Sequence, residues 1–211
     1  MRQQNFDWPA YIKRFSEYLP AFSSQYPWLL TSTATEIVSG ILSSLSTDYK
    51  IQDGIAIHKT SVIENNVTLK APVIIGINCF ISANCYLRGG VFIMANNSVG
   101  PGCEIKSSFI FPHSNLAHFN FIGDSIIGSN VNFEAGSITA NHFNERENKE
   151  ILAMINGQSV DTHTQKFGSL VGDNCKIGAN AVLSPGTVLP PNSMVKRLEL
   201  VDQQESKNAI P

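Results

Sequence analysis

Aliphatic side chains recur at every sixth residue through the middle of the chain. Stepping by six from the first of them meets nine in succession: Ile57, Ile63, Leu69, Ile75, Ile81, Leu87, Ile93, Val99 and Ile105. An α-helix repeats at about 3.6 residues and a half-buried strand alternates from residue to residue, so neither accounts for this spacing. A six-residue period is typical of a solenoid in which each hexad supplies one short strand and a turn, and three hexads make one coil. The pattern predicts a β-helix of triangular cross-section with these residues stacked inside.

A second set of positions lies two residues before each aliphatic residue and is mostly small or β-branched. All four cysteines of the chain belong to it: Cys79, Cys85, Cys103 and Cys175. Because an unpaired cysteine packs as a small apolar residue, we expect buried structural thiols, with a catalytic thiol as the alternative. No CxxC pair occurs, which argues against a zinc ribbon or a redox motif.

The hexad register changes on both sides of His118. It shifts by one residue at Ile110 and again at Ile127, and it is lost over 140–167 before it returns at Val171. A local break in a regular solenoid is a place where a side chain can be turned towards a ligand. His118 is therefore the first candidate functional residue.

The interruption at 140–167 holds many of the charged residues of the chain. A loop of this length is usually functional or disordered rather than incidental. We expect it to overhang the side of the prism, with a short strand or a helical turn between Glu150 and Ile155.

The first fifty residues lack the hexads. Aromatic and aliphatic residues follow helical spacing between Phe6 and Tyr18, and the run from Thr33 to Glu36 is typical of a capping box that opens a helix. We expect an α-helical appendage over residues 1–50 that packs against the solenoid or caps it, because the ends of solenoids need covering.

These observations divide the chain into three parts. The helical appendage at 1–50 is followed by a β-helix domain at 51–195, which contains the loop at 140–167. A polar tail at 196–211 is expected to end in a short helix or to be disordered.

Charge and hydropathy exclude several partners. The 211 residues carry a formal net charge of −2 and a pI of about 6.2, with no long basic run, so no nucleic-acid partner is expected. No stretch approaches the ~18 apolar residues of a transmembrane helix, and the N-terminus lacks the apolar core of a signal peptide. We expect a cytoplasmic protein without membrane association.

Two segments carry a family resemblance. The run AHFNFIGDSIIGSNVNFEAGSITAN at 117–141 resembles the acetyltransferase domain of bifunctional glucosamine-1-phosphate acetyltransferase and N-acetylglucosamine-1-phosphate uridylyltransferase enzymes. The run VDTHTQKFGSLVGDNCKIGANAVLSPGT at 160–187 is more similar to bifunctional sugar-1-phosphate nucleotidylyltransferases of archaea and some bacteria. The resemblance covers about 51–195, and no nucleotidylyltransferase domain is recognised in the chain. It implies a left-handed parallel β-helix, a homotrimer with the donor cleft between adjacent prisms, and acetyl-CoA as the donor.

The resemblance also implies roles for individual residues. His118 falls on the general base, and Asn141 falls on a second catalytic-site position. The substrate-binding positions are Arg88, Glu104, Lys106, Phe121 and Asn132, and the cofactor-binding positions are Ala135 and Ala179.

These residue types suit acetyl transfer to an amine. A histidine can accept the amine proton because its unperturbed pKa lies near the working pH. Backbone N–H groups or the Asn141 amide could stabilise the thioester oxyanion, and Arg88 and Lys106 could hold a phosphate on the acceptor. For His118 the alternative is a hydrogen-bonded structural histidine, and for the two cations it is a solvated edge of the prism.

Several positions depart from the family pattern. Phe121 replaces a tyrosine whose hydroxyl helps to hold the phosphate, and Glu134 stands where the family has glycine along the cofactor groove. His142 replaces an aromatic or aliphatic residue, and Thr164-Gln165 replaces a basic pair. Each of these changes weakens anion binding. The favoured function is acetylation of an amino-sugar phosphate or a nucleotide-linked amino sugar.

Three alternatives remain open. A degenerate β-helix could serve as a scaffold or bind sugar nucleotides without catalysis, and an acyltransferase could take its acyl group from acyl carrier protein. His113 and His118 have the five-residue spacing of two ligands in γ-class carbonic anhydrases, but the third ligand would be expected near Ser82, where no histidine stands. No metal is therefore expected.

Overall fold

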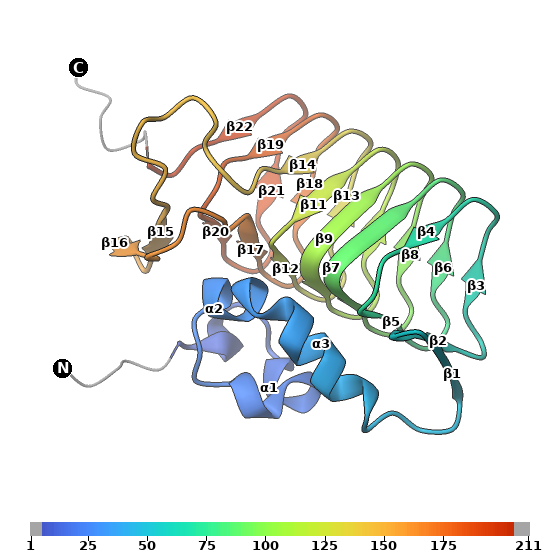
Figure 1. Cartoon of the computed structure of the whole chain (residues 1–211). Helices are drawn as coiled ribbons and strands as arrows, with labels where there is room; N and C mark the ends of the chain where they lie inside the picture. Colours follow the sequence, from blue (N-terminus) through green and yellow to red (C-terminus); the bar gives the residue numbers. More distant parts are fainter. Residues whose placement is uncertain (1–5, 205–211) are drawn as a thin grey trace, which may run out of the picture.

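A computed structural model describes residues 6–204 of the chain. They form a triangular prism of stacked coils with a group of short helices along one side (Figure 1). The prediction of an all-β, left-handed parallel β-helix with a small helical N-terminal appendage is confirmed. None of the helices in the described part of the chain is long and apolar enough to cross a membrane.

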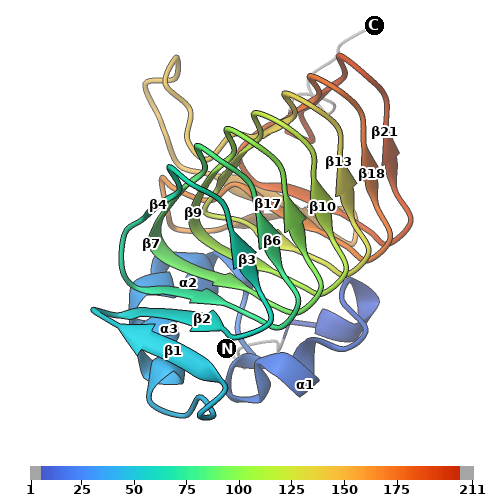
Figure 2. The same ribbon diagram turned by 90° about the vertical axis from the view of Figure 1, so that its right-hand side faces the viewer.

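Three faces of parallel strands form the sides of the prism (Figure 2). Face 1 consists of β2 (Ile55–His58), β5 (Val73–Ile75), the ends of β7 (Tyr86–Ile93) and β9 (Glu104–Ile110), β12 (Ile126–Ile127), β17 (Ser169–Val171) and β20 (Thr187–Leu189). Face 2 consists of β3 (Val62–Ile63), β6 (Phe80–Ile81), β8 (Ser98–Val99), β10 (Asn115–Leu116), β13 (Asn132–Phe133), β18 (Lys176–Ile177) and β21 (Met194–Val195). Face 3 consists of β4 (Thr68–Leu69), the beginnings of β7 and β9, β11 (Phe121–Gly123), β14 (Ile138–Thr139), β19 (Val182–Leu183) and β22 (Leu200–Val201). Face 2 has seven strands, one for each coil.

The hexad residues fill the interior of the prism as predicted. The aliphatic columns and all four cysteines belong to one buried cluster. At the corners, asparagines adopt the left-handed backbone region, for example Asn78 and Asn96 with φ of 52° and 59°. Asparagine tolerates this region better than most residues, and the two side chains also hydrogen-bond between coils at 3.2 Å. The asparagine-rich turns of the sequence are thus the corners of the solenoid.

The register shifts lie at one edge of the prism, between faces 3 and 1. Arg88 pairs with Lys106, 18 residues later, whereas Val91 pairs with Ser108, 17 residues later. The corner Gly89–Gly90 in one coil is therefore replaced by the single residue Ser107 in the next. We call this the Asp124 edge, because Asp124 occupies the same corner one coil further on, with a φ of 45°.

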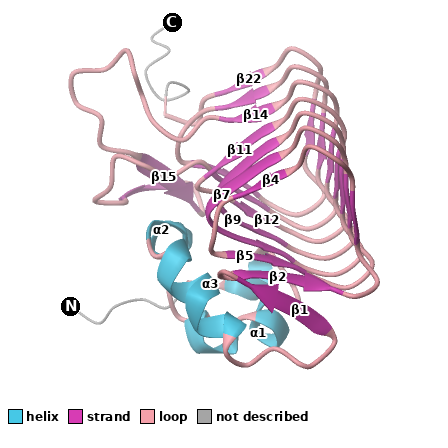
Figure 3. Ribbon diagram, turned by 45° about the vertical axis from the view of Figure 1, so that its right-hand side comes forward, coloured by secondary structure: helices cyan, strands magenta, loops and turns pink. Residues whose placement is uncertain are grey.

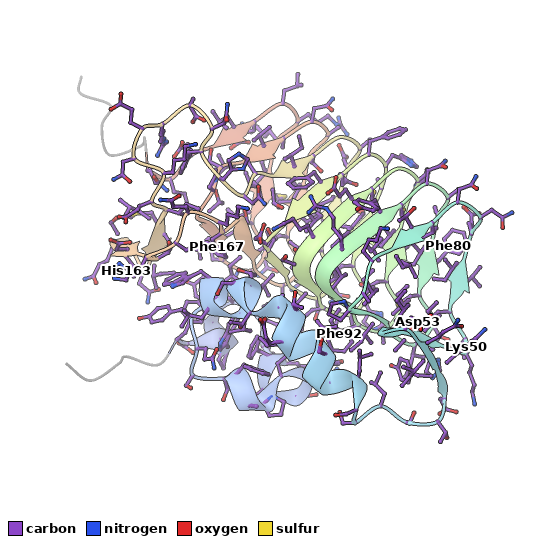
Figure 4. The ribbon with its side chains drawn as sticks, in the orientation of Figure 1. Lys50, Asp53, Phe80, Phe92, His163 and Phe167 are labelled. Carbon is purple, nitrogen blue, oxygen red and sulfur yellow. The ribbon has the colours of Figure 1, made fainter. Side chains whose placement is uncertain are left out.

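The long loop leaves the prism at the Asp124 edge and returns to it. Its middle forms an antiparallel hairpin of β15 (Leu152–Ile155) and β16 (Gln158–Asp161), which confirms the expected short strand (Figure 3). Phe167, labelled in Figure 4, lies where the loop rejoins the prism, with its ring 5.8 Å from that of Trp28. The loop is therefore anchored to the helical region.

The helices lie along face 1 rather than over an end of the solenoid (Figures 1 and 3). They are η1 (Trp8–Ala10), α1 (Phe15–Tyr18), η2 (Pro20–Phe22), α2 (Pro27–Ser32) and α3 (Ala34–Leu42). Their apolar residues form one cluster with the outward side chains of face 1, such as Ile74, Phe109 and Leu170. The appendage is a side cover, and it is held in place by a second core.

The residues with helical spacing from Phe6 to Tyr18 form two short helical turns, η1 and α1. One local prediction in the appendage is wrong. Thr33 does not cap α3, because its hydroxyl donates a hydrogen bond to the carbonyl of Leu29 at 2.7 Å. Thr33 is also the C-cap residue of α2. Because α2 runs almost directly into α3, no free turn remains for a capping box.

The boundaries at both ends of the solenoid shift outward. At the start, β1 (Tyr49–Gln52) pairs antiparallel with β2 and continues face 1. At the other end, the predicted solenoid ends at Val195, but β22 pairs with β19 and extends it to Val201. Residues 1–5 of the appendage and 205–211 of the tail lie outside the described residues.

Candidate functional site

His118 lies at the edge between faces 2 and 3, which we call the His118 edge. The backbone carbonyls of Pro101, His118, Ala135 and Ala179 each accept a hydrogen bond from the following coil, at 2.8 to 3.0 Å. These residues therefore stack above one another along the prism axis. The His118 side chain is exposed, and among the described residues its imidazole has no hydrogen-bond partner. Unlike a structural histidine, it is not held by hydrogen bonds within the described part of the chain.

Ala135 and Ala179, the two cofactor-binding candidates, belong to the same stack as His118. Each contributes only a methyl group to the edge, so neither adds side-chain bulk along this line. The structure thus brings three of the predicted site residues together along one line.

Face 3 carries most of the substrate-binding candidates on adjacent coils. Phe121 pairs in register with Glu104, and Arg88 pairs with Lys106. Arg88 forms an ion pair with Glu104 at 2.7 Å, with about a third of each side chain exposed, at 37% and 34%. The structure places all four residues on one outward surface, although the Arg88 charge is already paired.

Asp124 is a site residue that neither the hexad pattern nor the family resemblance indicates. Its carboxylate accepts hydrogen bonds from Lys106 Nζ at 2.7 and 2.6 Å and from the side-chain amide of Asn141. Only 6% of its side chain is exposed. An acid at a one-residue corner beside a register shift is the signal that could have identified it.

Asn141 lies at the Asp124 edge, on the opposite side of face 3 from His118. One amide hydrogen is given to Asp124, and the second remains available because a side-chain amide carries two. The side-chain oxygen of Asn141, Oδ1, is 3.2 Å from Nδ1 of His142. Within one chain the two predicted catalytic residues do not meet, since the width of face 3 separates them.

Asn132 lies on face 2. It pairs in register with Lys176, and its side chain is exposed. It lines a surface pocket with Glu134, Met194 and Arg197 around the end of the His118 edge. Asn132 is therefore separated from Arg88 and Lys106 by the edge itself.

Glu134 bridges three coils at the His118 edge. Its Oε2 accepts the Ala179 N–H at 2.9 Å and Arg197 Nε at 2.9 Å, and its Oε1 accepts Arg197 Nη2 at 3.1 Å. The hydrogen bonds from Arg197 and from the Ala179 N–H lower the pKa of the Glu134 carboxyl. The carboxylate thus occupies the backbone donor of a predicted cofactor-binding residue.

The two histidines of the carbonic anhydrase alternative do not converge. β10 separates His113, at the edge between faces 1 and 2, from His118 at the next edge. The described residues contain no group of three or more histidine, cysteine, aspartate or glutamate side chains arranged to hold a metal ion.

Comparison with known proteins identifies relatives over most of the chain. The family described as the GMPPB C-terminal domain matches residues 73–200. A protein named bifunctional protein GlmU from Methanococcus maripaludis is 34% identical over 190 residues, which cover 86% of this chain and 45% of the relative. A bifunctional sugar-1-phosphate nucleotidylyltransferase/acetyltransferase from Sulfurisphaera tokodaii is 30% identical over 151 residues, 71% of this chain and 37% of that protein.

The chain spans less than half the length of these curated relatives. Among solved structures it is similar to a hexapeptide transferase family protein from Anaplasma phagocytophilum, with 18% identity, a TM-score of 0.45, and coverage of 70% of this chain and 74% of that one. Since the family match takes in more than half of the sequence, the chain belongs to the family described as the GMPPB C-terminal domain.

Proposed function

We propose that the protein transfers an acetyl group from acetyl-CoA to the amine of an amino sugar that carries a phosphate or a nucleotide. The observation that carries this proposal is the stack of His118, Ala135 and Ala179, which combines an exposed, unpaired imidazole with an edge of small side chains. A base beside an edge of small side chains suits a long donor that lies along the prism.

His118 acts as the general base in this proposal. The acceptor amine attacks the thioester carbonyl, the C–N bond forms, and the imidazole takes the proton that the amine loses. The C–S bond then breaks, and the imidazolium gives its proton to the sulfur, so that CoA leaves as the thiol. Because Asn141 lies across face 3 from His118 within one chain, a backbone N–H, or the second amide hydrogen of Asn141 from a neighbouring prism, stabilises the oxyanion that forms between these events.

Arg88 and Lys106 bind the phosphate of the acceptor in this proposal. Both cations are already paired, with Glu104 and Asp124 respectively. The phosphate therefore joins existing ion pairs instead of meeting free charges. Phe121 supplies an apolar surface beside them and no hydroxyl.

We also propose that the protein works as a homotrimer with the donor cleft between adjacent prisms. The separation of His118 and Asn141 across face 3 supports this assembly, because a neighbouring prism would supply the missing wall of the cleft. Sedimentation equilibrium should then give three times the 23.1 kDa mass of the chain. A monomer at micromolar concentration would contradict it.

One observation favours a second candidate, a catalytically inactive β-helix that binds sugar nucleotides. Glu134 occupies the Ala179 N–H in a strip where an active donor site would leave it free. The two candidates differ in turnover, so a single assay separates them.

The test is a thiol-release assay with acetyl-CoA over a panel of amino-sugar 1-phosphates and nucleotide-linked amino sugars. His118→Ala should lower kcat/KM roughly 10²- to 10⁴-fold, the range typical of a general base. His113→Asn is the matched control, because His113 is also exposed but lies on another edge with a φ of 66° that asparagine tolerates. Turnover unchanged in His118→Ala would refute the base assignment, and absence of turnover with bound sugar nucleotide would favour the inactive protein.

A further inference from the structure

One carboxylate ties three successive coils together at the His118 edge. Glu134 accepts the Ala179 N–H of the next coil at 2.9 Å and receives two hydrogen bonds from Arg197 of the coil after that. Arg197 occupies the same place in its coil as Ala179 does one coil earlier, since the carbonyl of Ala179 accepts the N–H of Leu198. Arg197 therefore follows Ala179 in the line of His118, Ala135 and Ala179, and its ion pair with Glu134 spans the coil of Ala179.

Among the described residues the same backbone contact occurs once more on the His118 edge, two coils before His118. Glu64 Oε2 accepts the Ala83 N–H at 2.8 Å, at the equivalent corner near the start of the solenoid. Glu64 has no arginine partner among the described residues. A carboxylate on a corner N–H is thus a structural device of this solenoid, and the Arg197 partner distinguishes Glu134.

The Glu134–Arg197 pair is placed to exchange partners. The side chains are 38% and 74% exposed, and exposed ion pairs typically contribute only about 0–1 kcal/mol. Arg197 lines a pocket with Lys176 and Lys196, and neither lysine has an ion-pair partner in the described part of the chain. Glu134 is the only carboxylate among the described residues that line this pocket.

We propose that Glu134 competes with the donor for the Ala179 N–H. When the donor binds, Arg197 exchanges its ion pair with Glu134 for contacts with the donor phosphates. This inference rests on the proposed function, because it takes the His118 edge as the donor site. A backbone N–H donates one strong hydrogen bond, so a donor amide carbonyl can bind Ala179 only when Glu134 leaves. The released guanidinium then joins Lys176 and Lys196 in a cluster of three cations that suits a nucleoside phosphate.

The test measures binding of CoA and of pantetheine, which lacks the nucleotide phosphates, to the full chain by calorimetry. Glu134→Ala frees the Ala179 N–H and should lower the Kd of both ligands roughly 3- to 10-fold, because the competing pair is lost. Glu134→Gln keeps an acceptor for the N–H but loses the charge, so it should give a smaller gain. Arg197→Ala should weaken CoA binding by a similar factor without weakening pantetheine.

Glu64→Ala is the matched control, because it removes the same contact to a corner N–H outside the proposed donor strip. It should leave both dissociation constants unchanged. The inference is overturned if Glu134→Ala binds CoA no more tightly than the wild type, or if Glu64→Ala gives the same gain. Absence of CoA binding in every variant overturns both this inference and the proposed donor. Tighter binding by Glu134→Ala without acetyl transfer in any variant supports the inference and contradicts only the proposed chemistry.

Discussion

Asp124 holds Lys106 with both oxygens of its carboxylate, at 2.7 and 2.6 Å from the Lys106 ammonium. The same carboxylate accepts the Asn141 amide, so one nearly buried acid orients two of the predicted site residues. Its position follows from the one-residue corner at the Asp124 edge, which turns the side chain of Asp124 towards face 3. A residue with no expected role thus fixes the geometry of that side of the site.

The first prediction concerns the strength of this ion pair. Asp124→Asn should lower the free energy of unfolding by about 3 kcal/mol, because it leaves the Lys106 charge largely buried without its partner. Lys106→Met alone should be destabilising for the converse reason. The double variant should recover much of the loss, which urea unfolding measures as a coupling energy.

The pair between Arg88 and Glu104 is the control for this cycle. Its side chains are about one-third exposed, so the corresponding single variants should each cost less than about 1 kcal/mol. Equal costs for the two pairs would mean that burial does not set the strength of the Asp124 pair.

The second prediction concerns Gly123, which lies on face 3 between Phe121 and Asn141. A Cβ at Gly123 would lie 2.7 Å from Cε1 and Cζ of Phe121 and 3.0 Å from Nδ2 of Asn141. Gly123→Ala should therefore displace the Phe121 ring and the Asn141 amide. We expect kcat/KM to fall more than about tenfold, while the free energy of unfolding changes by less than about 1 kcal/mol, since the ring can swing towards solvent.

Gly40 provides the control, because nothing lies within 4 Å of an added Cβ and it stands inside α3. Gly40→Ala should leave activity unchanged and raise stability by about 0.5–1 kcal/mol, as a helix-interior glycine gives way to alanine. A loss of activity from both substitutions would point to a general effect of added volume and not to the contacts of Gly123 with Phe121 and Asn141.

The solenoid could be predicted because its signal is repeated. Each interior column needs an apolar residue in every coil, so the same requirement returns every six residues from Ile57 onwards. The register shifts were also readable, since a one-residue corner moves every later hexad by one. The hairpin of the loop was expected only as a possible short strand, because one antiparallel pair leaves no repeat.

The contacts that define the site leave no such repeat. Glu134 and Arg197 are 63 residues apart, and Asp124 and Asn141 are 17 residues apart across a coil of altered length. Such pairs form only after the coils stack in register. Thr33 failed as a capping residue for a similar reason: whether its hydroxyl serves α3 or the preceding helix depends on how closely the two helices join.

The third prediction compares two buried serines on neighbouring coils of face 1. Ser125 Oγ donates to the Gly123 carbonyl at 2.7 Å and accepts the Ser169 N–H at 2.9 Å. Ser169 Oγ is buried without a hydrogen-bond partner among the described residues. Ser125→Ala should therefore lower the free energy of unfolding by about 1–3 kcal/mol, because it leaves a buried N–H unsatisfied.

Ser169→Ala should be neutral or should raise stability by up to about 1 kcal/mol, since it removes a buried hydroxyl that makes no hydrogen bond. Thermal unfolding of the two variants under identical conditions provides the comparison. A loss of more than about 1 kcal/mol in Ser169→Ala would show that this hydroxyl has a partner in solution.

The last prediction concerns the thiols. All four cysteines are buried, and Cys79 Sγ donates to the Met94 carbonyl at 2.8 Å while Cys175 Sγ donates to that of Pro190 at 3.2 Å. Burial raises the pKa of the Cys79 and Cys175 thiols, so the reactive thiolate is scarce in the folded protein. Iodoacetamide at pH 8 should therefore leave Cys79 and Cys175 of the native protein unlabelled, whereas all four thiols should react in denaturant.

The same shifts make stability depend on pH in alkaline solution. The unfolded chain loses its thiol protons near a pKa of about 8.5, before the folded protein does, so it binds fewer protons over that interval. This contribution to stability is complete below about pH 8.5 and is lost as the pH rises towards the folded-state pKa. Urea midpoints at pH 7.5 and 9.5 should differ less when Cys79 and Cys175 are both replaced by alanine. Rapid labelling of one native thiol with loss of turnover would instead restore the catalytic cysteine, which the burial of these side chains argues against.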